Sequence, residues 1–531
     1  MNQTRNAKIA LAGGGAALLL LLEQAKRAHR AGRLDEARQL YLRVLAIDVH
    51  HADGLFLLGC EELDAGRAEV AARMFERAIA VDDRRAEFFL WQAQALRIVG
   101  RLPESVAGCD RALALDAGCA EVHFERGNAW RDLKQTCAAI ASYRRALELD
   151  PRLFQSYVNL GNLLLAEGEL ETVAEGYRRY LVLDPQKVDA HCCLSGVLYL
   201  QGRYVAAQAS LEEALKLEPT NAEARWNLAL LQLVQGDLAK GLENFEARYR
   251  RFGMAEEYCC PHWQGEPLAG RSILLLDEQG LGDTIQFLRF VPKVEAAGGR
   301  VSVRVSKPLR RLAEASWPSV AWIDASEPLP DFDALCPLMS LPHVFGVSVV
   351  TISAVAETPY LRVPEEARQK ASSLLWEKKK RCVGLVWAGN PAHALDRFRS
   401  IALDALRPLF AIPDLQFYSL QMGAGAAQRT ETDLPLIDLS AHIGDMADTA
   451  ALLEHLDLLI GVDTSVVHLA GALGRPVWML TPAAPDWRWM TEREDSPWYP
   501  SLRLFRQKKL GDWTSVVARV ATALRAYQQK F

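Results

Sequence analysis

A 34-residue periodicity runs through the first half of this chain and constrains its fold more than any other feature. Glycine falls on this spacing at six positions and Lys134 fills the remaining slot; the glycines are Gly32, Gly66, Gly100, Gly168, Gly202 and Gly236. Acidic residues repeat at the same spacing at Asp48, Asp82, Asp116, Asp150, Asp184 and Glu218. In one unit, apolar residues from Phe154 onward follow helical spacing. Gly168 is placed to end that helix with a positive φ. Pro185 then blocks continuation of the next helix. Since one helical pair cannot bury its apolar face alone, the sequence predicts a stack of such pairs.

This pattern resembles the tetratricopeptide repeat over residues 18–251, about seven units. The resemblance implies an all-α superhelix whose concave groove binds a peptide or a partner protein. Asn159 and Asn227 share one repeat position, where related arrays use asparagine to hold a peptide backbone. Cys193 and Glu125 stand at other equivalent positions, so a plain scaffold or a dimerisation surface is the alternative.

The composition and the N-terminus indicate an ordinary globular protein with no transmembrane segment. Basic and acidic residues nearly balance over 531 residues, with a formal net charge of −5, so no basic field favours nucleic acid. The apolar stretch 9–22 is too short to cross a bilayer and lacks a small-residue cleavage pattern. We expect a cytoplasmic protein, with peripheral association with the inner membrane as an alternative.

The ten cysteines have neither the spacing of a zinc ribbon nor that of a disulfide framework. Cys259, Cys260 and His262 form one short cluster, which is fewer ligands than a closed metal site needs. Asp331-Phe332-Asp333 has the spacing found in metal-dependent transferases of another fold, but it lies in a proline-flanked loop. The sequence therefore predicts reduced thiols and no metal site.

After Phe252 the periodicity ends, and short β-rich runs alternate with helical stretches. The expected strands are Ile273–Leu276, Val301–Val305, Val383–Val386, Leu415–Leu420, Leu458–Ile460 and Val477–Leu480. Strands that alternate with helices form parallel sheets with crossover helices. The expected segments after the repeats are a linker at 252–269, Rossmann-like lobes at 270–375 and 381–515, and a closing helix at 516–531. The predicted fold class is thus an α superhelix followed by an α/β domain.

Ligands of such sheets bind beyond the carboxyl ends of the strands, and three loops stand out there. The first contains Gly280-Leu281-Gly282-Asp283, after strand Ile273–Leu276. The third glycine of a dinucleotide-binding fingerprint is missing from this loop. The next strand ends at Arg304, where that fingerprint has an acidic residue, so the sequence disfavours NAD binding. Asp283 is either a helix cap or a carboxylate that faces the space between the lobes and accepts a proton from a substrate hydroxyl.

The second loop is glycine-containing and basic. Trp387-Ala388-Gly389-Asn390-Pro391 follows a strand and precedes Arg397 and Arg399. Arginine offers planar, bidentate donors that match phosphate oxygens, so Asn390 and the two arginines are candidate donor-binding residues. A solvated basic loop is the alternative.

The third loop brings Asp463, Thr464 and Ser465 from strand Leu458–Ile460 to the start of a helix. Free N–H groups and the helix dipole at such a position favour an anion, for example a diphosphate. His468 lies one turn further along, on the same face as Thr464. We expect these four residues to bind the anion, although a lone histidine is more often structural.

Together the three loops resemble glycosyltransferase family 9, the bacterial heptosyltransferase-like enzymes of the GT-B fold, over residues 270–515. The resemblance implies that Gly282-Asp283 supplies the catalytic base. It also implies that Asp463, Thr464 and His468 bind the donor diphosphate, and that Arg397 and Arg399 assist the phosphates.

The leading hypothesis is a metal-independent, inverting glycosyltransferase with no cofactor other than its nucleotide-sugar substrate. The repeats would recruit a protein or glycan-carrier acceptor. One alternative is a repeat scaffold whose transferase domain has lost its chemistry. Another is an enzyme similar to protein O-GlcNAc transferases.

Overall fold

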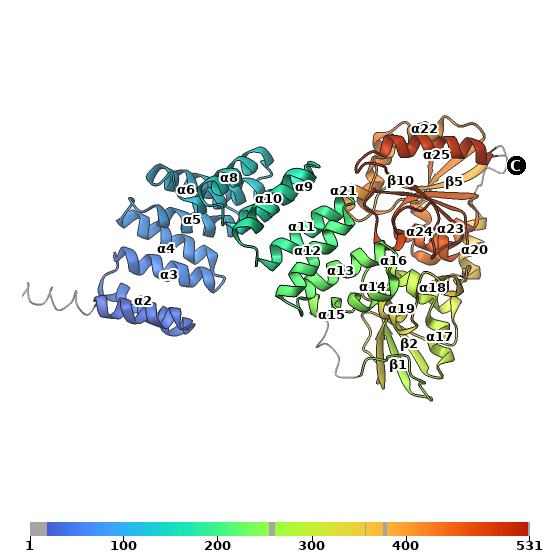
Figure 1. The fold of residues 1–531 in the computed structure, drawn as a ribbon, viewed down its shortest axis with the longest axis horizontal. Coiled ribbons are helices and arrows are strands. Elements are labelled where there is room, and N and C mark those ends of the chain that lie inside the picture. The colour runs from blue at the N-terminus through green and yellow to red at the C-terminus, as the bar shows by residue number, and fades with distance from the viewer. Residues whose placement is uncertain (1–17, 254–260, 356, 375–379, 394, 529–531) are drawn as a thin grey trace, which may run out of the picture. The chain divides into compact units, whose positions relative to one another are not determined.

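The structure is a computed structural model (Figure 1), and the chain divides into two compact units, Met1–Leu194 and Ser195–Phe531. The structure describes residues 18–253, 261–355, 357–374, 380–393 and 395–528. Cys259, Cys260 and most of the apolar stretch 9–22 lie outside these ranges.

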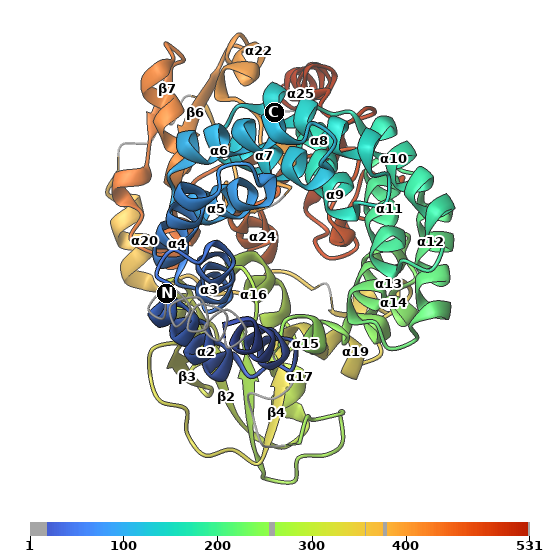
Figure 2. The same cartoon turned by 90° about the vertical axis from the view of Figure 1, so that its left-hand side faces the viewer.

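The first unit is a curved stack of antiparallel helical pairs, as predicted (Figure 2). Residues 18–30 are helical, and the helices that follow are α2 (Leu34–Ile47), α3 (Ala52–Asp64), α4 (Ala68–Val81), α5 (Ala86–Ile98), α6 (Leu102–Leu115), α7 (Ala120–Asp132), α8 (Thr136–Leu149), α9 (Phe154–Ala166) and α10 (Leu170–Leu183). Helix α11 (Val188–Leu200) contains the boundary between the two units. That boundary thus falls within the repeats, before the linker that the sequence suggested.

Small residues on one helix of a pair make room for a ring on the other. A Cβ atom added to Gly127 in α7 would lie 2.6 Å from Cε1 of Tyr143 in α8, and one on Gly59 would lie 2.6 Å from Cε1 of Phe75. Both rings are fully buried. The close approach of the two helices within each pair therefore depends on glycine at these positions.

The periodic glycines end the first helix of each pair in the left-handed conformation, with φ between 71° and 87°. Lys134 takes the same conformation, with φ of 60°, which costs a residue with a Cβ atom about 1 kcal/mol. We therefore expect Lys134→Gly to raise the stability of the repeats by roughly 0.5–1 kcal/mol, measured as a higher urea midpoint of the helical circular dichroism signal. Gly168→Lys is the matched control and should lower the midpoint; an unchanged midpoint for both variants would contradict this explanation.

The second unit begins with the remaining repeat helices. They are α12 (Tyr204–Leu217), α13 (Ala222–Val234), α14 (Leu238–Phe245) and the single turn α15 (Arg248–Arg251). Residues 238–251 have the 14-residue span of the second helix in the other repeats, but the helix is interrupted between Phe245 and Arg248. Leu233 and Phe245 belong to the same hydrophobic core as Ile273 and Leu275 of the following sheet.

The two α/β lobes follow, each built on a parallel sheet. The first sheet has the order β3-β2-β1-β4, with β1 (Ser272–Leu276), β2 (Arg300–Val305), β3 (Ala321–Asp324) and β4 (Ala334–Pro337). The second has the order β10-β9-β8-β5-β6-β7, with β5 (Arg381–Val386), β6 (Leu415–Ser419), β7 (Leu436–Asp438), β8 (Leu458–Val462), β9 (Val477–Thr481) and β10 (Leu502–Arg506). All neighbouring strands are parallel, so the predicted combination of an α superhelix with an α/β domain is confirmed.

Helices cover the sheets in layers. The first lobe contains α16 (Leu281–Leu288), α17 (Val291–Ala296), α18 (Lys307–Ser316) and α19 (Leu341–Val344), and the helix that follows, α20 (Glu365–Ser372), packs against α23 (Met446–Glu454) of the second lobe. The second contains α21 (Asp396–Arg399), α22 (Arg407–Phe410), α23 (Met446–Glu454), α24 (Ser465–Ala472) and α25 (Trp513–Gln528), and short 3₁₀ turns, including η7 (Trp487–Trp489), occur in both lobes. Helices α22 and α25 lie on one face of the second sheet, and α23 and α24 lie on the other (Figure 1).

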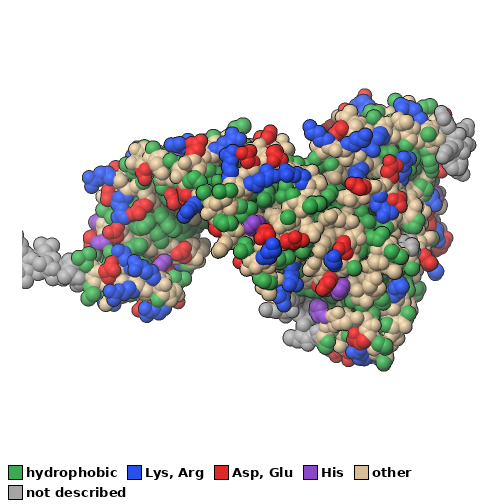
Figure 3. Space-filling view, viewed as in Figure 1, with side chains coloured by type: hydrophobic (Ala, Val, Ile, Leu, Met, Phe, Trp, Pro, Cys, Tyr) green, Lys and Arg blue, Asp and Glu red, His purple; other side chains and the backbone are tan. Residues whose placement is uncertain are grey.

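Basic and acidic side chains are interspersed over the visible face of the protein (Figure 3). Within the described ranges, no helix combines the length and apolar character needed to cross a membrane.

Candidate functional site

The topology of the second sheet places the predicted binding loops next to one another. Strands β5, β8 and β9 are neighbours in that sheet, and parallel strands end at the same edge. The loop with Asn390 and Arg399 follows β5, the loop with Asp463 follows β8, and η7 follows β9. Three segments that are distant in sequence thus meet at one edge.

The first lobe contacts this edge through Gly282. A Cβ atom added to Gly282 would lie 2.9 Å from Cδ2 of His468, so a side chain at this position would collide with the imidazole. Helix α16 carries Gly282 and helix α24 carries His468, and the two helices pack against each other. The predicted base loop and the predicted diphosphate loop are therefore in direct contact.

Asp283 follows at the third position of α16, with its side chain 21% exposed. One carboxylate oxygen accepts a hydrogen bond from the Gly280 amide at 2.9 Å, as expected for an aspartate in the first turn of a helix. The other accepts from a guanidinium N–H of Arg488. An ionised carboxylate has about four acceptor sites, so these two bonds leave capacity for a substrate hydroxyl. The contact with the Gly280 amide fits the interpretation of Asp283 as a capping residue, and its role as a proton acceptor stays a prediction.

Asp463 and His468 form a compact network with two aromatic residues. Trp489 Nε1 donates to Asp463 at 2.9 Å, and Nε2 of His468 lies 3.6 Å from the other Asp463 oxygen. Nδ1 of His468 is 2.9 Å from the Tyr499 hydroxyl. Burial alone would raise the pKa of Asp463, but its hydrogen bonds to His468 and Trp489 and the charge of Arg399 lower it overall. Both predicted residues thus orient each other at the site.

The start of α24 retains donors for an anion. Thr464 is the N-cap residue, yet its side chain does not cap the helix. Its hydroxyl is buried and has no hydrogen-bond partner within the described ranges. Ser465 is the first residue of the helix and is partly exposed. A buried, unpaired hydroxyl beside free helix amides is suited to an anionic group.

The loop after β5 contributes one of its two arginines. The guanidinium of Arg399 lies against Gly389, where an added Cβ atom would be 2.6 Å from Nη2, and Nε donates to Asp396 at 3.1 Å. Arg397 is exposed and stacks on Phe398. Asn390 is also exposed, and its side-chain oxygen accepts from the backbone of its own turn. Because the charge of Arg399 lowers the pKa of Asp463, Arg399 is the better candidate for a donor phosphate.

Sequence reasoning did not identify Arg488, which lies at the centre of the site. Its side chain is 6% exposed and donates to Asp283, to Asp486 at 3.0 Å and to Gln286 at 2.6 Å. Burial lowers its pKa, but the carboxylates of Asp283 and Asp486 raise it overall. The two tryptophans on either side of Arg488, Trp487 and Trp489, were the available signal, because tryptophan is highly buried on average.

The remaining candidates lie elsewhere. In the first unit, Asn159 donates to Asn128 at 2.9 Å, and in the second, Asn227 donates to Glu223 at 3.2 Å. Asp333 accepts two hydrogen bonds from Ser272, which lower its pKa. Across the described ranges, no three His, Cys, Asp or Glu side chains are grouped so that they would hold a metal ion.

Comparison with protein families finds matches in both halves of the chain. Residues 56–118, 127–168 and 196–236 match tetratricopeptide repeat families. Residues 432–487, which span β7 to η7, match glycosyltransferase family 9 (heptosyltransferase). Protein FlbA of Caulobacter vibrioides is 31% identical over 332 residues, which cover 56% of this chain and 54% of the relative. The chain therefore spans about half the length of this relative.

Several solved structures are similar to part of this chain. MamA is 19% identical, with a TM-score of 0.29 over 31% of this chain and 96% of the other. The Pseudomonas aeruginosa PilF structure is 17% identical, with a TM-score of 0.35 over 40% and 97%. A thermophilic tetratricopeptide repeat protein from Thermus thermophilus is 22% identical, with a TM-score of 0.30 over 34% and 100%. The chain therefore contains tetratricopeptide repeats, followed by a two-lobed α/β region of which residues 432–487 match glycosyltransferase family 9.

Proposed function

We propose that this protein transfers a sugar from a nucleotide sugar to a protein or glycan-carrier acceptor that the repeats recruit. The observation that carries the proposal is the contact between Gly282 and His468. This contact brings Asp283, a carboxylate of the first lobe, to the start of α24 in the second lobe. That helix start is the one best suited to a diphosphate. A base and a leaving-group site on opposite lobes are the two parts that such a transfer needs.

The transfer is a single displacement with inversion at the anomeric carbon. Asp283 takes the proton of the acceptor hydroxyl while the hydroxyl oxygen forms a bond to the anomeric carbon. The bond from that carbon to the diphosphate oxygen breaks, and the nucleoside diphosphate leaves with the electron pair. Arg399, the Thr464 hydroxyl and the amides at the start of α24 stabilise its charge. These groups supply positive potential from the protein itself, which is the basis for proposing metal-independent transfer.

Calorimetric titration of the full-length chain with UDP-, GDP-, ADP- and CMP-sugars tests the proposal. The full chain is needed because Leu233 and Phe245 of the repeats belong to the core of the first lobe. We expect one nucleotide class to bind without added metal and to be hydrolysed or transferred slowly. Binding by none of the four classes would reject the proposal and favour the scaffold alternative.

Replacement of Arg399 measures the phosphate contact. A charged hydrogen bond contributes roughly 1.5–3 kcal/mol, and about 1.4 kcal/mol corresponds to a tenfold change in affinity. We therefore expect Arg399→Ala to weaken donor binding by roughly 10- to 100-fold in the same titration. Arg397→Ala is the matched control, two residues away and exposed, and should change affinity less than threefold. An equal loss in both variants would mean that the loop acts only through its net charge.

A further inference from the structure

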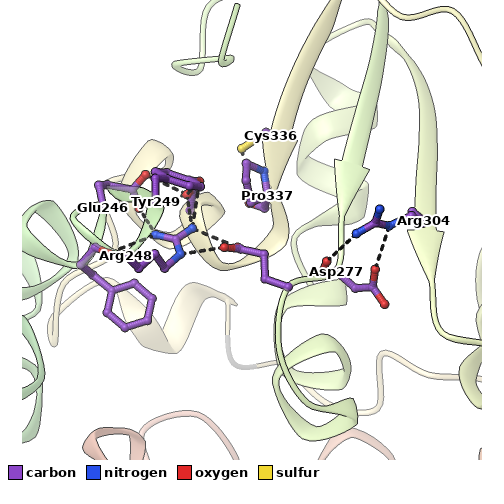
Figure 4. Close-up of polar contacts among 10 residues, drawn as sticks. Glu246, Arg248, Tyr249, Asp277, Arg304, Cys336 and Pro337 are labelled. Atoms are coloured by element: carbon purple, nitrogen blue, oxygen red, sulfur yellow. Dashed lines mark hydrogen bonds and ion pairs between the residues drawn. The ribbon is translucent and has the colours of Figure 1, made fainter. Parts of the chain in front are cut away.

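We propose that Arg248, at the end of the repeats, is a positioning residue for the loop that carries Asp283. The inference rests on the proposed function and adds a role for the last repeat in the transfer step. It comes from a buried arginine that forms a network with Glu278 in the same loop as Asp283 (Figure 4).

The internal repeats show how unusual this arginine is. The positions equivalent to Arg248, at intervals of 34 residues, hold small or apolar residues: Val44, Ala78, Ala112, Ala146, Tyr180 and Ala214. All of them are buried, and the Arg248 side chain is also 0% exposed. A repeat that served only to stack on its neighbour would keep an uncharged residue here. The arginine is instead explained by its partners in the α/β domain.

Those partners saturate the guanidinium. Nε and Nη2 donate to the two carboxylate oxygens of Glu278 at 2.8 and 3.0 Å. Nη1 donates to Glu246 at 2.6 Å, and Nη2 also donates to Ser340 at 2.6 Å and to Tyr249 at 2.9 Å. The Glu278 side chain is 4% exposed. Such a bidentate arginine–carboxylate pair fixes direction as well as distance, so it holds the backbone at Glu278 in one place.

Side-chain hydrogen bonds hold the segment 277–283, which is the loop before α16 and the first turn of that helix, at three points. Asp277 accepts from Arg304 at 3.2 Å and from Ser306 at 2.9 Å, on the opposite side from Arg248 (Figure 4). Glu278 is held by Arg248, and Asp283 is held by Arg488. Removal of the Arg248 contact would leave Asp277 and Asp283 as the remaining attachments of this loop.

The same repeat helices also contact the segment that carries Arg488. The Thr491 amide donates to the Val234 carbonyl at 3.1 Å, and the Tyr199 hydroxyl donates to the Pro485 carbonyl at 2.6 Å. The Phe245 ring lies 5.9 Å from that of Trp487. The last repeats therefore contact both the loop with Glu278 and the segment with Arg488. Since these two segments hold Asp283, the last repeats contribute directly to its placement.

The test uses the full-length double variant Arg248→Met/Glu278→Gln. Replacement of both partners removes the bidentate pair without leaving either of its two buried charges alone, and Glu246, whose side chain is 28% exposed, keeps its hydrogen bond from Ser340; both facts favour a folded variant. We expect amide hydrogen exchange in peptides covering 277–288 to become at least tenfold faster. We expect kcat for sugar transfer to fall about 10- to 100-fold, because a misplacement near 1 Å can cost that much. The dissociation constant of the donor should stay within threefold, since α24 and Arg399 are unchanged.

The matched control is Arg368→Met, which removes another bidentate arginine–glutamate pair, with Glu454 at 2.8 and 3.0 Å. It should leave both the exchange of 277–288 and kcat unchanged. Unchanged exchange of this segment in the double variant would overturn the proposal, and so would faster exchange with wild-type kcat. The exchange measurement requires no substrate, so it decides the role of Arg248 even if no nucleotide sugar is turned over.

Discussion

Asp283→Asn is expected to lower kcat for sugar transfer by about 10²–10⁴-fold, the usual contribution of a general base. Asparagine keeps the size of the side chain and can still accept from the Gly280 amide, but it cannot take the proton of the acceptor hydroxyl. The donor dissociation constant should change less than threefold, because Asp283 belongs to the first lobe and the phosphate-binding residues belong to the second. Steady-state transfer and calorimetry on the same preparation separate the two effects.

Asp333→Asn is the control for Asp283→Asn, since Asp333 lies at the other end of the same sheet and is bound by Ser272. Its kcat should remain within twofold of the wild-type value. Loss of transfer in Asp333→Asn but not in Asp283→Asn would contradict the assignment of the base. It would direct attention to the acidic pair at Asp331 and Asp333, the spacing used by metal-dependent transferases of another fold.

The repeats were predictable because their information is local and recurs. Each glycine on the 34-residue lattice takes the left-handed conformation that its position required, and Lys134 takes it too. The strands Ile273–Leu276 and Leu458–Ile460 were found because continuous apolar runs are typical of strands buried on both faces. Strands β3, β4, β7 and β10 were missed. Three of these have only three or four residues, too few to show a period.

The candidate site was predictable only in part, because its geometry depends on contacts between distant segments. The loops with Asp283 and His468 could be identified from their positions after strands, and the structure places them in contact. Nothing local indicated that Arg488 would pair with Asp283, which is 205 residues away. The same holds for Arg248 and Glu278. Partners of buried charges are set by tertiary packing, so one sequence shows the charged residue but not its counterpart.

Arg488→Met is expected to lower the free energy of unfolding of the second unit by about 3 kcal/mol. This value is the lower end of the range for removing one partner of a buried ion pair. The lower end applies because Asp283 and Asp486 are 21% and 37% exposed and regain some hydration. Methionine fills most of the volume, so the loss reports the charge and its hydrogen bonds rather than a cavity. Urea unfolding followed by tryptophan fluorescence measures the change, since Trp487 and Trp489 flank the substituted residue.

A double-mutant cycle separates the Arg488–Asp283 interaction from general effects at Arg488. When Asp283→Asn is combined with Arg488→Met, the second substitution should cost at least about 1 kcal/mol less than it does alone, because coupled neighbours are not additive. Arg503→Met is the control: Arg503 is 49% exposed and pairs with Glu494, and such a surface pair contributes about 0–1 kcal/mol. Additive costs for Arg488 and Asp283 would mean that their contact contributes nothing to stability. In that case Asp283 would depend on the Gly280 amide and on the loop held by Arg248 for its position.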